Sequence, residues 1–224
     1  MEAVPGLGEL SWRIAHAHGD AGAFHATDPE PVRSATFHTV ERATLVLGSA
    51  QTDDAVDADA AAGLGLELVR RRSGGGAVLL VPGEFVWLDL VLPAGDPLWS
   101  DDVGRAMEWV GELWLGALSE IGVRHASVHR GGLVPSQWSR AVCWAGVGTG
   151  EVMVDGAKLV GVSQRRTRTY ARFQTMCHLA WRPEWVAALV APPRPSVAEL
   201  TGLAACVPDA AAVAVAAALT AALP

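Results

Sequence analysis

The chain has 224 residues, half of them hydrophobic, and a formal net charge of -7 at pH 7. This size and composition predict one domain with a sizeable core. The acidic balance argues against a general binder of nucleic acid or of membrane surfaces, because such proteins carry an excess of basic residues.

The cysteines and the chain ends carry further expectations. Cys143, Cys177 and Cys206 are widely spaced and odd in number, which argues against a disulfide framework and a cysteine-bound metal. The first residues lack the basic and apolar regions of a signal peptide, and the alanine-rich stretch near the last residue is too short to span a bilayer. We therefore expect a soluble cytoplasmic protein.

The first half of the sequence predicts several strands and two helices. Residues 43–51 predict a buried strand, residues 53–65 a helix stopped by glycines, and "LELVRRR" a second strand. "AVLLV" and "FVWLDLVLP" flank Pro82-Gly83, which suits the centre of a type II turn, so this segment predicts a β-hairpin. Apolar residues at helical spacing from Val103 to Ile121 predict the longest helix.

The second half adds strands and then helices. Residues 151–166 predict a hairpin that turns at Asp155-Gly156, and "FQTMCHLAW" predicts one more strand. "SVAE" at 196–199 fits a capping box that opens a short helix, and an alanine-rich helix follows Pro208-Asp209. The irregular alternation of strands and helices predicts an α+β domain.

Basic residues gather in two short segments. Arg70, Arg71 and Arg72 run into Ser73 and three glycines, and residues 157–172 hold five basic residues and no acid. Glycine lets backbone N–H groups approach an anion, and arginine supplies forked donors for phosphate or carboxylate. Either segment alone is more often a solvated strand or an ordinary loop, so the prediction of an anion site depends on both together.

Together, the two segments resemble the signatures of the lipoate–protein ligase and octanoyltransferase family, which is related to the biotin–protein ligases. The first signature is "RRRSGGGA" at residues 70–77, and the second is "GAKLVGVSQR" at residues 156–165. "LVLGSAQ" at residues 45–51 matches a family strand. The resemblance covers about residues 40–182. It implies one catalytic domain over residues 1–224, with a mixed, mainly antiparallel sheet flanked by helices, an apolar tunnel for an acyl chain and a helical C-terminal extension at 183–224.

The resemblance also implies a site. Lys158 is the implied catalytic residue, which would contact the acyl carbonyl and stabilise the charge that develops as an amine attacks. No metal ligand is expected among the side chains. The positions that the signatures assign to binding the acyl group and its anionic head are Arg70, Arg71, Ser73, Gly74, Gly75, Gly76, Ala77, Gly161, Ser163 and Gln164.

The implied reaction activates lipoate or octanoate with ATP and Mg²⁺ to an acyl-adenylate. The acyl group then passes to a lysine of a lipoyl domain, either of a 2-oxoacid dehydrogenase or of a glycine cleavage H-type protein. Neither a nucleic acid nor a membrane is an expected partner.

Two alternatives stay open. A second branch of the family takes octanoyl from acyl carrier protein onto a cysteine without ATP, and Cys143 resembles that nucleophile. A thiolate near cations is a good nucleophile, although a free cysteine is more often a small packed side chain. The other alternative is a non-catalytic acyl-binding protein.

The sequence departs from the family at three places. Leu79-Leu80-Val81 stand where members carry a polar pair after the glycines, and Thr175-Met176 replace a His-Gly pair. Only about forty residues follow the family core, so we expect no accessory domain of the kind that many ATP-dependent ligases carry. We expect these departures to weaken ATP-dependent ligation and to leave acyl binding intact.

Overall fold

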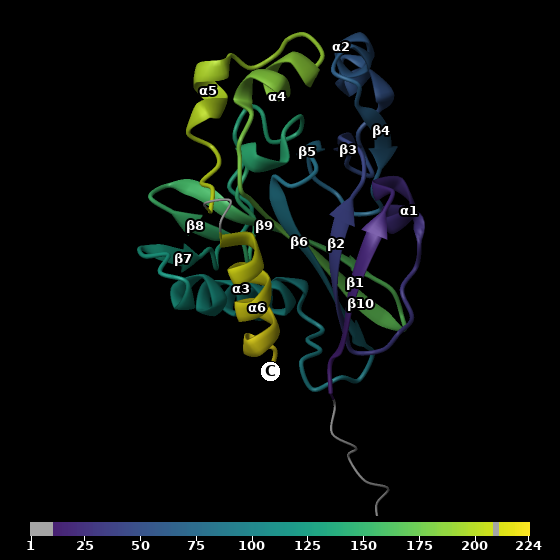
Figure 1. Cartoon of the computed structure of the whole chain (residues 1–224), viewed down its shortest axis with the longest axis vertical. Helices are drawn as coiled ribbons and strands as arrows, with labels where there is room; N and C mark the ends of the chain where they lie inside the picture. The colour runs from purple at the N-terminus through teal and green to yellow at the C-terminus, as the bar shows by residue number, and fades with distance from the viewer. Residues whose placement is uncertain (1–10, 208–210) are drawn as a thin grey trace, which may run out of the picture.

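The computed structural model describes residues 11–207 and 211–224, and its α-helices and β-strands are labelled in Figure 1. The strands are β1 (Arg13–Gly19), β2 (Ser34–Val40), β3 (Thr44–Leu47), β4 (Glu67–Arg70), β5 (Val78–Leu80), β6 (Phe85–Pro93), β7 (Ala126–Val128), β8 (Val152–Val154), β9 (Ala157–Arg166) and β10 (Tyr170–His178). The helices are α1 (Ala21–Ala26), η1 (Asp53–Ala55), α2 (Ala58–Gly63), α3 (Val103–Glu120), η2 (Cys143–Ala145), α4 (Pro183–Leu189), α5 (Val197–Thr201) and α6 (Ala212–Ala222).

Within the described residues, the strands form two sheets. The larger has seven strands in the order β1, β2, β6, β10, β9, β8, β7, and the smaller has the order β4, β3, β5. Each sheet has one parallel pair, β1 with β2 and β3 with β4, and all other neighbours are antiparallel. The predicted α+β class, with a mixed and mainly antiparallel sheet, is confirmed.

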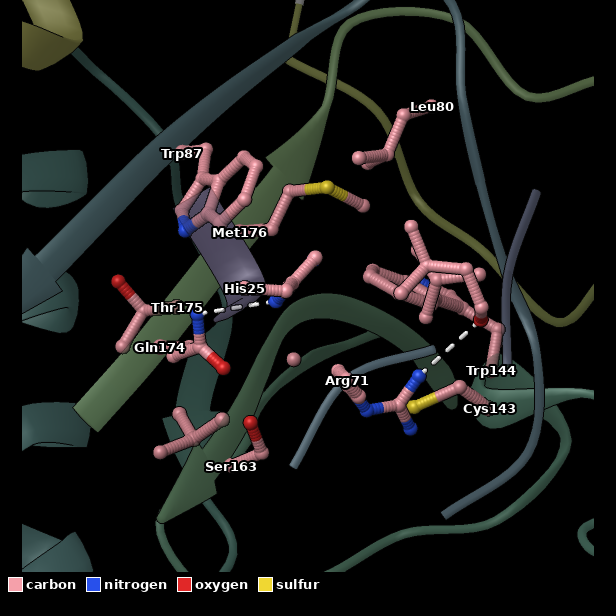
Figure 2. Close-up of a pocket in the computed structure, with 14 residues that line it drawn as sticks. His25, Arg71, Leu80, Trp87, Cys143, Trp144, Ser163, Gln174, Thr175 and Met176 are labelled. Carbon is pink, nitrogen blue, oxygen red and sulfur yellow. Dashed lines mark hydrogen bonds between the residues drawn. The ribbon is translucent and has the colours of Figure 1, made fainter. Parts of the chain in front are cut away.

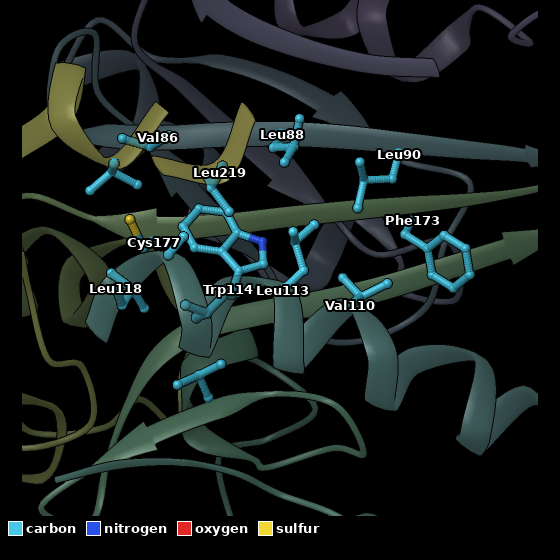
Figure 3. Close-up of a cluster of buried hydrophobic side chains, with 14 of the residues drawn as sticks. Val86, Leu88, Leu90, Val110, Leu113, Trp114, Leu118, Phe173, Cys177 and Leu219 are labelled. Atoms are coloured by element: carbon cyan, nitrogen blue, oxygen red, sulfur yellow. The ribbon is translucent and has the colours of Figure 1, made fainter. Parts of the chain in front are cut away.

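Helices α3 and α6 cover one face of the large sheet (Figure 3). Trp114 of α3, Phe173 of β10 and Leu219 of α6 are fully buried in this cluster. The side chain of Asp102 caps α3 by accepting hydrogen bonds from the first-turn backbone. The long helix predicted from apolar spacing is therefore confirmed, and its apolar side faces the sheet.

The other face of the large sheet packs against the small sheet. Successive side chains of a strand point to opposite faces, so Leu88 of β6 joins the helix-covered cluster while Trp87 joins a second cluster. That second cluster also contains Val46 of β3, Leu80 of β5 and Met176 of β10. The space between the two sheets is therefore a separate apolar layer.

The hairpin predicted across Pro82-Gly83 is wrong, although its turn forms. The Glu84 backbone N–H donates to the Val81 carbonyl at 3.0 Å, and Gly83 has φ +80°, as a type II turn requires. However, β5 pairs with β3, whereas β6 pairs with β2 and β10. The turn carries the chain from the small sheet to the large one.

Other local predictions are confirmed. Asp155 and Gly156 have φ +48° and +84°, the conformation of a two-residue hairpin turn between β8 and β9. The capping box between Ser196 and Glu199 opens α5. The predicted alanine-rich helix is α6, while Pro208 and Asp209 lie outside the described residues.

The segment after α5 is joined to the large sheet. The Lys158 N–H donates to the Leu203 carbonyl, and the Ala205 N–H donates to the Lys158 carbonyl, both at 2.9 Å. This part of the predicted C-terminal extension therefore supports the start of β9. No helix in the described part of the chain is both long and apolar enough to cross a membrane.

Candidate functional site

A β-bulge sets the direction of Lys158. In a regular strand Lys158 and Ser163 would point to opposite faces. The pairing of β9 with β8 shifts register beside Val152, which adds one residue to β9. As a result Leu159 and Val160 both lie in the helix-covered cluster, whereas Lys158 and Ser163 line one cleft.

Lys158 is buried, with 2% of its surface exposed, and its ammonium group has two polar partners. Nζ lies 2.7 Å from Oε2 of Glu151 and donates to the Cys143 carbonyl at 2.9 Å. It also lies 5.5 Å from the centre of the Trp144 ring. Burial raises the pKa of Glu151 above its ordinary value, although the Lys158 charge opposes that shift. The pair places one fixed positive charge next to Cys143.

The three-glycine loop is held from inside by Arg71. The buried guanidinium donates to the carbonyls of Gly74 at 2.7 Å and Gly76 at 2.8 Å, and to that of Val46 at 3.3 Å. Arg70 donates to the carbonyls of Gly48 and Gln51 and pairs with Asp53 at 2.5 Å. Arg71 therefore shapes the glycine loop through its own backbone, whereas Arg70 fixes the neighbouring segment 48–53.

An open cleft of about 950 Å³ lies over this loop. Gly74, Gly75 and Gly76 line it, together with six residues of another segment: Leu133, Pro135, Ser136, Gln137, Ser139 and Arg140. Cys143, Glu151 and Lys158 also line this cleft.

A smaller cavity of about 70 Å³, here called the inner pocket, lies between the two sheets (Figure 2). Cys143, Val162 and Ser163 line both the inner pocket and the cleft, so the two cavities adjoin at these residues. The apolar side chains that define the inner pocket include Val46, Val78, Leu80, Trp87, Trp144 and Met176. An apolar chain in the inner pocket could thus present a polar end to the cleft.

Arg71 and Cys143 lie beside each other where the cavities adjoin (Figure 2). A Cβ atom placed on Gly75 would lie 2.9 Å from Arg71 Nη2 and 3.8 Å from Cys143 Sγ. The Cys143 backbone is fixed by its N–H, which donates to the Ala77 carbonyl at 3.0 Å. The glycine loop therefore positions the thiol as well as lining the cleft.

The far side of the inner pocket carries a neutral histidine. His25 stacks on Trp87 with ring centres 4.8 Å apart, and its Nδ1 lies 3.3 Å from Nε2 of Gln174. Burial lowers the pKa of His25 to about 4, so the ring is uncharged at pH 7. This side of the pocket can offer a hydrogen bond without a charge.

The structure brings most of the predicted site residues together. Arg71 and Gly161 line the inner pocket, Gly74–Gly76 and Lys158 line the cleft, and Cys143 and Ser163 line both. Ser73 and Ala77 support them, since Ser73 Oγ donates to Ser163 Oγ at 3.1 Å.

Two predicted residues lie elsewhere. Arg70 lines neither cavity. Gln164 is registered opposite Phe173 of β10, on the helix-covered face of the sheet, and its amide has no hydrogen-bond partner among the described residues. We therefore leave both out of the candidate site. The residues that sequence reasoning missed are His25, Arg140, Glu151 and Gln174. For Glu151, the only indication in the sequence is an isolated acid between a glycine-rich loop and an apolar strand.

The donor set of the cleft is a poor match for a divalent ion. In residues 11–207 and 211–224, no three histidine, cysteine or acidic side chains gather into a group that could hold a metal. Glu151 is the one carboxylate that lines the cleft in this part of the chain, and it binds Lys158. Mg²⁺ would therefore have to arrive with a nucleotide rather than on protein ligands.

The sequence and the fold correspond to a known class of protein. The model of the lipoyl protein ligase A/B catalytic domain family matches residues 23–212, so the chain belongs to this family. The resemblance of the two signatures is thereby confirmed, and the matched span extends beyond residues 40–182 at both ends.

Individual proteins are similar to this chain in sequence or in fold. The chain is 24% identical over 166 residues to octanoyltransferase LipM of Clostridioides difficile, covering 69% of this chain and 60% of that protein's length. A bipartite lipoate protein ligase from Thermoplasma acidophilum, described with its E2 lipoyl domain, has a similar fold, with a TM-score of 0.68 and 15% identity over 93% of this chain and 80% of that one. A lipoate–protein ligase A bound with ATP has a similar fold, with a TM-score of 0.60 and 17% identity over 85% of this chain and 71% of that one.

Proposed function

We propose that this protein transfers an octanoyl or lipoyl group to a lysine of a lipoyl domain, with Cys143 as the nucleophile that carries the acyl group. The observation that carries this proposal is the position of Cys143 where the inner pocket adjoins the cleft. An acyl chain in the inner pocket has its carbonyl carbon beside the sulfur, and the cleft gives the donor and the acceptor access to that carbon.

In the first step, the Cys143 thiol gives its proton to water, and the resulting thiolate attacks the thioester carbonyl of an acyl carrier protein. A new carbon–sulfur bond forms, the carrier's carbon–sulfur bond breaks, and the carrier leaves as a thiolate. The Lys158 ammonium donates a hydrogen bond to the backbone carbonyl of Cys143. It therefore lies close to the reacting centre and supplies a positive charge for the oxyanion of the tetrahedral intermediate. In the second step, the amine of the lipoyl-domain lysine attacks the Cys143 thioester: a carbon–nitrogen bond forms, the carbon–sulfur bond breaks, and the Cys143 thiolate leaves and takes up a proton from the amine nitrogen.

A second candidate is ATP-dependent ligation through an acyl-adenylate. The cleft of about 950 Å³ over the glycine loop has room for a nucleotide, which favours this route. Against it, Arg70, Arg71 and Lys158 already bind the protein's own carbonyls and carboxylates. We propose the thiol route first because it needs no release of these cations.

The compartment follows from the same chemistry. Cys143, Cys177 and Cys206 are free thiols. Free thiols are typical of a reducing compartment, so we propose that the reaction takes place in the cytoplasm.

The test is the intact mass of a purified apo lipoyl domain incubated with this protein. One arm supplies octanoyl carrier protein without ATP, and the other supplies ATP, Mg²⁺ and lipoate or octanoate. We expect a mass gain in the first arm, which Cys143→Ala abolishes. A gain in the second arm alone would establish the ligase, and no gain in either arm would favour an acyl-binding protein. An apo glycine cleavage H-type protein tests the other acceptor class.

A further inference from the structure

This inference rests on the proposed function and concerns the acceptor lysine. Such a lysine reaches the cleft as an ammonium ion, yet only an uncharged amine can attack a thioester. A base must therefore stand near the thioester. Among the described residues that line the cleft, Glu151 is the single carboxylate, and no histidine lines it.

The two carboxylate oxygens of Glu151 differ in their partners. Oε2 receives both the Lys158 ammonium and the Gly148 N–H, each at 2.7 Å. For Oε1 the described part of the chain supplies one long hydrogen bond, at 3.4 Å from the Val162 N–H. Each carboxylate oxygen can accept two hydrogen bonds, so Oε1 retains acceptor capacity.

We propose that Oε1 of Glu151 binds the ammonium group of the incoming lysine and accepts its proton. The ammonium gives one proton to Glu151, and the resulting amine attacks the acyl carbonyl carbon on Cys143. The new carbon–nitrogen bond replaces the carbon–sulfur bond, and Cys143 leaves as a thiolate. The second nitrogen proton passes to that thiolate, which restores the thiol, and Glu151 then releases its proton to water in the cleft.

The surroundings of Glu151 suit this role. The Lys158 ammonium fixes the carboxylate through Oε2, so that the second oxygen has a defined position. Besides Glu151 and Lys158, the charged side chain that lines the cleft among the described residues is the exposed Arg140. Arg140 is positively charged, so it does not compete with Glu151 for the ammonium group of the incoming lysine. Burial raises the pKa of Glu151, which makes the carboxylate a better proton acceptor than an exposed one.

The experiment separates loading of the enzyme from its discharge. Wild-type protein and Glu151→Gln are first loaded with octanoyl on Cys143, and the thioester is isolated and measured by mass. Discharge is then followed in single turnovers with either apo lipoyl domain or hydroxylamine, which is uncharged at pH 7 and needs no deprotonation. We expect Glu151→Gln to load normally, to react with hydroxylamine at the wild-type rate, and to transfer to the lipoyl domain about 100-fold more slowly.

The matched control is Glu84→Gln, which makes the same change at an ion pair with Arg182 outside the cleft and should leave both discharge rates unchanged. Equal slowing of Glu151→Gln with both nucleophiles would overturn the proposal, because Glu151 would then act only by holding Lys158. Unchanged transfer to the lipoyl domain would overturn it as well. If the wild-type protein forms no thioester, the proposed thiol route fails, and the same two discharge reactions are measured with octanoyl-adenylate supplied as the preformed donor.

Discussion

Gly74 and Gly76 belong to the same loop but have different surroundings. A Cβ atom on Gly76 would lie 2.6 Å from backbone atoms of Val142, whereas a Cβ atom on Gly74 would have no neighbour within 4 Å. We expect Gly76→Ala to displace the segment that carries Cys143, to lower the free energy of unfolding by about 1–3 kcal/mol and to reduce acyl transfer strongly. Gly74→Ala should change stability little. Urea unfolding and the mass assay check both variants, and equal behaviour of the two would contradict this packing argument.

His178 makes stability depend on pH. It is buried between Trp144 and Trp181, at ring distances of 4.4 Å and 5.2 Å, and burial lowers its pKa to about 3. Between about pH 6.5 and pH 3 the unfolded chain therefore binds a proton that the folded chain does not bind. This contribution to stability is complete above pH 6.5 and is lost as the pH falls, with a limiting slope of about 1.4 kcal/mol per pH unit. His25 acts in the same direction down to about pH 4.

The measurement is the free energy of unfolding by urea at several pH values between 4 and 7.5. His178→Phe should flatten the pH dependence, because the ring contacts remain possible and the protonation step is removed. A slope that His178→Phe does not reduce would show that other groups cause it.

At the scale of single residues, the sequence predicts which residue types form the site better than it predicts the face of the sheet to which each side chain points. The signatures place Lys158, Gly161, Ser163 and Gln164 on one strand, and strict alternation would set Lys158 apart from Gly161 and Ser163. The extra residue at the start of β9 reverses that relation and leaves Gln164 on the opposite face. A bulge depends on the partner strand, so no pattern within β9 alone could predict it.

At the scale of elements, one buried ion pair fastens α1 to the large sheet. Arg172 of β10 donates to Asp89 of β6 through Nε at 2.8 Å, and to the carbonyls of Phe24 and Thr27 at 2.8 Å and 3.0 Å. Burial alone would raise the pKa of Asp89, but the hydrogen bond from His38 and the charge of Arg172 hold it at about 2. The carboxylate is therefore ionised at neutral pH.

We expect Asp89→Asn to lower the free energy of unfolding by about 3–5 kcal/mol, because it leaves the Arg172 charge buried without its counterion. The change should also weaken acyl binding, since α1 carries His25 into the inner pocket. Urea unfolding and the KM for the acyl donor measure the two effects. Glu30→Gln, the same change at the exposed pair with Arg13, should alter neither. A loss at Asp89 no larger than the loss at Glu30 would contradict the proposed fastening.

The error at Pro82-Gly83 has an origin at the same scale. "AVLLV" and "FVWLDLVLP" are apolar on both faces, because each strand lies between two layers. Such runs carry no alternation of polar and apolar residues that would indicate the partner strand. The turn between them is therefore the only local indication of how they pair. The Asp155-Gly156 hairpin was predictable because two positive φ values in succession strongly favour those two residue types.

For the whole molecule, the departures from the family signatures lie together. Leu80, Thr175 and Met176, which stand at or beside positions where the family carries polar pairs, all line the inner pocket. Two segments that are distant in sequence thus change the same cavity, and two of the three residues are apolar. This grouping is invisible without the fold, because only the packing of β5 over β10 brings Leu80 to Met176.

One face of the large sheet contributes mainly to stability, and the other face carries the inner pocket. Substitutions of Leu219 and Val213 in α6 test this division. Leu219 is fully buried against the helix-covered face, whereas Val213 is 82% exposed on the same helix. We expect Leu219→Ala to lower the free energy of unfolding by about 2–5 kcal/mol, and Val213→Ala to change it by less than about 0.5 kcal/mol. The inner pocket lies on the other face, so below the melting transition Leu219→Ala should keep the wild-type KM for the acyl donor. Urea unfolding, and initial rates at a temperature below the melting transition of both variants, check the two expectations. A raised KM in Leu219→Ala with unchanged stability would mean that the two apolar layers are coupled through the sheet, and α6 would then belong to the functional site.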